Sequence, residues 1–159
     1  MCDEVAYHEA GHAFMAIYVG ARVRCVTVDP DNDDGPPRSG DTQVEWPLGN
    51  LSQRDFVTKS ILVALAGPVA EMLYRGEPYH PGVVDEWTAD WVLAWQTAEA
   101  LFPDESKRMA FLEQTTVQVY RMLDRDDHWA ALAALVDNLL AHETLEGEEV
   151  ADIVASWMR

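Results

Sequence analysis

The sequence predicts a mainly α fold with a small β-hairpin, or a two-to-three-stranded sheet, that follows the first helix. Apolar residues recur every three or four positions through most of the chain, which is typical of helices packed on a core. Only residues 22–28 alternate polar and apolar side chains and are rich in β-branched ones, which favours a strand. The 159 residues are 48% hydrophobic, enough to bury one core, so we expect a single domain over residues 1–159.

The first helix is predicted to cover about residues 5–19, with Gly20 as its C-terminal stop. Its apolar residues include Val5, Ala6, Ala13, Phe14, Ala16, Ile17 and Val19. The strand at residues 22–28 is expected to pair with residues 42–46. An acidic segment rich in Pro, Gly and Asp, residues 29–40, separates the two strands.

Five further helices are expected in the rest of the chain. Ser52, with Asp55 three residues later, resembles a capping box at the start of a long apolar helix. Gly67 and Pro68 should kink that helix. After a break rich in Pro and Gly at residues 77–82, helices are predicted over residues 85–101, 103–123, 127–142 and 148–158.

Charge and composition exclude several classes of partner. The chain has 28 acidic and 11 basic residues, a formal net charge of −17, which repels nucleic acid and anionic membrane surfaces. No run of 18 or more apolar residues is evident, so we expect no membrane span. Two cysteines give no disulfide framework and no signal-peptide pattern is present, so the expected location is the cytoplasm.

The pentad His8-Glu9-Ala10-Gly11-His12 is the strongest chemical signal in the sequence. On a helix, histidines four residues apart share one face, close enough to bind one metal ion, with the glutamate beside them as a general base. The alternative is two core histidines with ordinary hydrogen-bond partners. The pentad lies in a largely apolar helix, where each buried imidazole needs a partner, so we favour a metal site.

A catalytic zinc site needs a third protein ligand and one open position. The other histidines, His80, His128 and His142, look like solvent-side residues. Four acids border apolar helical runs, where an unpaired charge is costly: Glu71, Asp85, Glu86 and Asp90. Asp90 lies among small and large apolar residues, a setting that favours a metal or a cation as its partner.

Four segments, one of them at residues 90–98, resemble the peptidase domain of the FtsH-type ATP-dependent zinc proteases, in the same order. Residues 5–13, around the pentad, resemble that family's metal-binding helix. Residues 65–71, Leu-Ala-Gly-Pro-Val-Ala-Glu, are similar to its second helix. Residues 139–150 resemble the segment that joins its last two helices. Together they extend the resemblance through nearly the whole chain.

The resemblance also implies a third ligand. In that family an Asp opens a helix and is followed by Ala four and eight residues later, as Asp90 is by Ala94 and Ala98. Asp85 does not fit this spacing. Glu71 stays open as a rival, because other zinc peptidases with H-E-x-x-H use a Glu from a later helix.

The implied function is a zinc-dependent endopeptidase in which His8, His12 and Asp90 hold Zn²⁺ and Glu9 is the general base. No G-x-x-x-x-G-K-[ST] motif occurs in the sequence, so we expect an ATP-independent, stand-alone domain that cleaves unfolded or flexible polypeptides, or one that a separate ATPase partner supplies. Residues 29–40 also differ from the shorter glycine-bearing turn of the family.

The alternative is a catalytically silent interaction or regulatory module with structural or absent zinc. The oligomeric state stays open, since the family's hexamers form largely through the motor domain.

Overall fold

The computed structural model describes residues 2–29 and 40–158. Within them the chain forms six α-helices and one three-stranded antiparallel sheet, which confirms the predicted mainly α fold with a small sheet. The elements are α1 (Cys2–Tyr18), β1 (Arg22–Thr27), β2 (Asp41–Glu45), α2 (Gln53–Arg75), α3 (Thr88–Ala98), α4 (Glu105–Leu123), α5 (Asp126–His142), β3 (Thr144–Glu146) and α6 (Gly147–Trp157).

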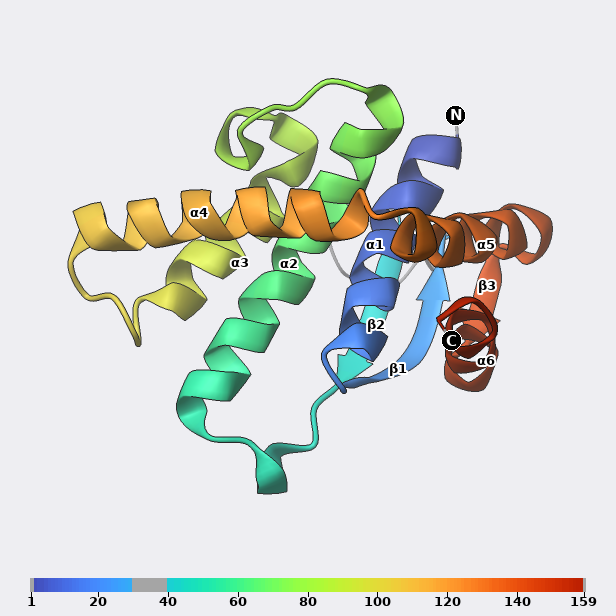
Figure 1. Ribbon diagram of the computed structural model, residues 1–159, viewed down its shortest axis with the longest axis horizontal. Coiled ribbons are helices and arrows are strands. Elements are labelled where there is room, and N and C mark those ends of the chain that lie inside the picture. The colour runs from blue at the N-terminus through green and yellow to red at the C-terminus, as the bar shows by residue number, and fades with distance from the viewer. Residues whose placement is uncertain (1, 30–39, 159) are drawn as a thin grey trace.

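Helix α1 occupies the centre of the molecule, in contact with α2, α5 and the sheet (Figure 1). Its buried face is built largely from small residues, which lets its neighbours approach closely. At Gly11 the approach requires glycine, because a Cβ there would overlap the carbonyl oxygen of Ala66 and lie 2.7 Å from the Cβ of Ala70. The pentad is therefore held directly against the middle of α2.

The sheet has the order β2-β1-β3, with both outer strands antiparallel to β1. Val26 of β1 pairs with Thr42 on one side and with Leu145 on the other. The pairing of β1 with β2 agrees with the sequence prediction, whereas β3 was not assigned to particular residues. The acidic segment predicted between the first two strands lies mostly outside the described residues. Strand β2 forms one edge of the described sheet, beside α1.

Helix α2 begins as predicted. The side chain of Ser52 accepts a hydrogen bond from the backbone N–H of Asp55, at 3.1 Å, and Gly76 ends the helix with a positive φ of 78°. The helix is continuous through Pro68, where the sequence predicts a kink. One part of α2 contributes to the main apolar cluster around α1, and another part to a second cluster with α3 and α4.

This double role explains why α2 is so apolar. An 18-residue window of the helix has a mean hydropathy of 1.5, which by length and composition is enough to cross a membrane. The prediction that no such segment exists is therefore too strict. However, 67% of that window is buried inside the fold, as in the core helix of a globular domain.

Two local predictions need correction. The helix expected from Asp85 is shorter: residues 85–87 form a 3₁₀ turn and α3 begins at Thr88. The prediction that His128 faces solvent is wrong, because its side chain is only 2% exposed and packs against the rings of Phe14 and Tyr18. Position 128 lies in the first turn of α5, which packs against α1.

Candidate metal centre

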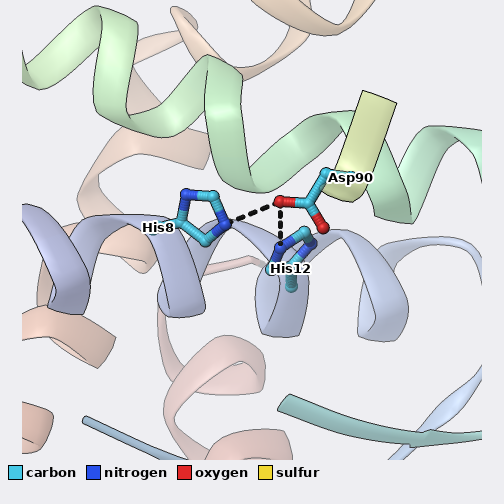
Figure 2. A group of neighbouring side chains, drawn as sticks. All are labelled: His8, His12 and Asp90. Carbon is cyan, nitrogen blue, oxygen red and sulfur yellow. Dashed lines mark hydrogen bonds and ion pairs between the residues drawn. The ribbon is translucent and has the colours of Figure 1, made fainter. Parts of the chain in front are cut away.

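The two histidines of the pentad lie one turn apart on α1 and face the same carboxylate. The Nε2 atom of His8 is 2.8 Å from Oδ2 of Asp90, and the Nε2 atom of His12 is 3.4 Å from the same oxygen. Figure 2 shows both imidazoles directed at Asp90, which comes from α3. One potential ligand atom from each of the three residues lies within 4.8 Å of the others. The structure thus brings together the three residues expected to hold the metal.

Each imidazole is also held by its other nitrogen. Nδ1 of His8 is 2.8 Å from Oε1 of Glu71, and Nδ1 of His12 is 2.7 Å from the carbonyl oxygen of Val63. Both partners accept hydrogen bonds, so both rings donate from Nδ1, which leaves each Nε2 to serve as a metal ligand. This arrangement of oriented imidazoles with one carboxylate fits the donor set of a catalytic zinc site.

Glu71 lies on the Nδ1 side of His8, whereas Asp90 lies on the Nε2 side. The second carboxylate oxygen of Glu71, Oε2, is 3.1 Å from a guanidinium nitrogen of Arg75. The same nitrogen is 3.0 Å from a carboxylate oxygen of Glu4. The Glu71 side chain is only 7% exposed, so the Arg75 cation offsets the cost of burying its charge. This geometry suits orientation of His8 better than direct metal binding.

The group forms a charged network. Burial disfavours the charged form of His8, but hydrogen bonds with Asp90 and Glu71 outweigh it and raise its pKa to about 10. Burial also disfavours the charged form of His12, but the charge of Asp90, its hydrogen bond and the charge of Glu9 together outweigh it and raise the pKa of His12. For Asp90, burial is outweighed by His12 and His8, which hold its pKa well below the usual range. A metal ion at these atoms would have to displace protons from the imidazoles.

Glu9 follows His8 and belongs to the same cleft. It is 7% exposed, and its Oε1 accepts a hydrogen bond of 2.7 Å from the hydroxyl of Thr42 on β2.

The cleft has a volume of about 760 Å³. Apolar side chains on its walls include Val44, Trp46, Ala64 and Leu93, and acidic ones outside the histidine–carboxylate group include Glu4, Asp41 and Glu86.

Sequence reasoning missed three supporting features: the carbonyl of Val63, the hydroxyl of Thr42, and Gly67. A Cβ at Gly67 would overlap the imidazole of His12, so only glycine lets that ring lie flush against α2. A glycine inside a helix lowers stability relative to alanine. The occurrence of glycine at position 67 of a predicted helix is therefore a sequence signal that could have marked it. The other two features carry no sequence signal.

The histidines outside the pentad do not join this group. His80 caps the 3₁₀ turn at Pro81–Val83, where its Nδ1 accepts from the backbone N–H of Gly82, and its ring contacts Trp91. His142 is exposed at the end of α5. His128 forms a hydrogen bond of 2.8 Å from Nδ1 to the carbonyl of Met122. Of the two remaining acids, Asp85 is exposed and Glu86 lies at the wall of the cleft.

Comparison with known proteins finds a zinc metalloprotease that is similar to this chain. The ATP-dependent zinc metalloprotease FtsH of Opitutus terrae (strain DSM 11246 / JCM 15787 / PB90-1) is 32% identical to this chain over 179 residues. The match covers 95% of the chain, which spans 28% of the length of that relative. No protein-family model matches the chain. Sequence similarity therefore supports a relationship to FtsH across nearly all of this chain.

Proposed function

We propose that this chain is a zinc-dependent endopeptidase domain, with His8, His12 and Asp90 as the zinc ligands. The observation that carries the proposal is the convergence of two Nε2 atoms on one Asp90 oxygen, while each Nδ1 is engaged by a separate acceptor. Such oriented imidazoles are characteristic of metal centres. The resemblance to a zinc metalloprotease supports the same choice of metal.

The chemistry follows from the residues around the site. When bound, zinc polarises a carbonyl group and lowers the pKa of water toward neutrality. Glu9, next to His8 and on the cleft wall, is the general base. Its carboxylate takes a proton from the attacking water and later delivers it to the nitrogen of the leaving amine, so that the peptide bond breaks and the base is restored.

The shape of the cleft favours an extended polypeptide as substrate. Strand β2 lines the cleft and forms an edge of the described sheet, so its backbone can pair with an added strand. The apolar wall suits apolar side chains of an unfolded chain. We infer that the protein acts on unfolded or flexible polypeptides in the cytoplasm, either without ATP or supplied by a separate ATPase.

The test combines metal content with proteolysis. Purified wild-type protein and Glu9→Gln are assayed for zinc by mass spectrometry and for cleavage of casein, an unfolded substrate. We expect one zinc per chain in both proteins and cleavage by the wild type alone, because the substitution removes the base and keeps the ligands. Stoichiometric zinc with no cleavage by either protein would contradict the peptidase function for unfolded substrates.

A catalytically silent module is the second candidate. The feature that favours it is the direct bonding among His8, His12 and Asp90, since such a cluster satisfies its own polar groups within a folded core. In that case the wild type would be folded, with structural or absent zinc, and inactive. The presence of Glu9 favours the enzyme, because a structural site has no use for a base beside it.

A further inference from the structure

We propose that Thr42 is a positioning residue for Glu9, which holds the general base in the orientation needed for the reaction. This inference rests on the function proposed above and adds a residue to it. The feature that carries it is the contact between β2 and α1, where the two elements meet at the cleft.

The Thr42 hydroxyl lies 2.7 Å from Oε1 of Glu9 and 3.2 Å from the backbone carbonyl oxygen of the same residue. A hydroxyl has one proton to donate, and the shorter distance to the charged acceptor assigns that proton to the carboxylate. Glu9 is 7% exposed, and this partial burial makes the bond stronger than it would be in bulk water. It restricts the rotation of the terminal carboxylate.

The position of Thr42 is itself fixed by the sheet. Thr42 pairs with Val26 on the central strand, so its hydroxyl is placed by the ladder between β1 and β2. Gly40 lets this part of the chain approach Glu9 closely. A Cβ at Gly40 would lie 2.8 Å from Cγ of Glu9 and 2.9 Å from Cγ1 of Val5, too close without a shift of the chain. Gly40 and Thr42 therefore hold both the methylenes and the carboxylate of Glu9.

The contact with Thr42 gives the two carboxylate oxygens of Glu9 different roles. Oε1 accepts the hydrogen bond from Thr42, which leaves Oε2 to take the proton from water. Because a general base acts in the transition state, loss of its orientation should lower kcat and leave KM nearly unchanged. Zinc binding should not change, since Thr42 touches none of the three proposed ligands through a hydrogen bond in the described residues.

The experiment compares Thr42→Val, which keeps the shape of the side chain and removes the hydroxyl, with Thr42→Ser, which keeps the hydroxyl. We expect about a tenfold loss of kcat on casein-derived peptides in Thr42→Val, with KM and zinc content unchanged, and near wild-type kcat in Thr42→Ser. Thr144→Val is the matched control. It makes the same change on the opposite edge strand β3, where Thr144 is exposed and bonds to Thr27.

Crystal structures of the two Thr42 variants provide a readout independent of activity. Glu9 should keep its orientation in Thr42→Ser and change it in Thr42→Val. An unchanged Glu9 or an unchanged kcat in Thr42→Val would overturn the proposal. If the wild type cleaves no substrate, the proposed function fails, and the Glu9 orientation alone then decides the role of Thr42. If Thr42→Val does not fold, Thr42→Ala takes its place, because it also removes the hydroxyl that donates to Glu9.

Discussion

The candidate metal centre and the start of α5 both contain largely buried histidines, but the surroundings of their rings differ. His8 and His12 each engage an acceptor through Nδ1 and face Asp90 through Nε2. His128 donates from Nδ1 to the carbonyl of Met122 and otherwise packs against the rings of Phe14 and Tyr18.

The difference shows that burial alone does not mark a ligand. His128 is buried, at 2% exposed, whereas both histidines of the pentad are only partly buried. What sets the pentad apart is convergence: two Nε2 atoms reach one oxygen at the edge of an open cleft. His128 has aromatic neighbours, and its role is to fill the core.

The largest expected effect is at Asp90. Asp90→Ala removes the oxygen on which both histidines converge, so zinc affinity should fall by more than about 100-fold, beyond the usual effect of an outer-shell change. A zinc titration against a competing chelator measures the loss. The matched control is Asp85→Ala, an exposed acid on the neighbouring 3₁₀ turn, which should bind zinc like the wild type. Retention of zinc by Asp90→Ala would point instead to Glu71 as the third ligand.

Gly67→Ala should have the next largest effect. The added Cβ would overlap the His12 imidazole at Nε2, so the ring has to shift from this position, and we expect zinc affinity to fall by roughly 10- to 100-fold. Alanine favours the helix over glycine, so stability alone does not predict this loss. Gly49→Ala is the control, because a Cβ there meets no atom within 4 Å. Equal zinc affinity in both variants would show that the His12 ring is not fixed by α2.

Glu71→Gln should have a smaller effect, of about tenfold in zinc affinity. The amide oxygen can still accept from Nδ1 of His8, but the charge that polarises the ring and pairs with Arg75 is lost. The same chelator competition measures it, with Glu86→Gln as a control in the cleft wall. A loss as large as that of Asp90→Ala would instead make Glu71 a metal ligand.

His128→Phe should leave zinc binding unchanged and lower the free energy of unfolding by about 1–2 kcal/mol. The phenyl ring fills similar space, but the carbonyl of Met122 loses one of its hydrogen-bond donors. Urea unfolding of the metal-free protein measures the change, and exposed His142→Phe should show little effect. Weaker zinc binding in His128→Phe would contradict the division between the two groups of histidines.

The sequence predicted most of the helices because their signals are local. Ser52 and Asp104 cap α2 and α4 through backbone N–H groups three residues ahead, and both can be identified along the chain. His128 was assigned wrongly because its cover comes from α1, more than one hundred residues earlier. The bounds of α3 were also missed, since a 3₁₀ turn takes up the first three residues of the predicted helix.

By itself the sequence determined the spacing that puts His8 and His12 on one face of a helix, with Glu9 beside them, because helical periodicity is a local property. Only the tertiary structure decided which acid meets them. Asp90 and Glu71 lie 82 and 63 residues from His8, and their opposite positions around its ring depend on how α2 and α3 pack against α1. The same packing placed Gly67 under His12 and Thr42 beside Glu9. Contacts between distant segments follow from the shape of the packed core, which no local pattern of residues encodes.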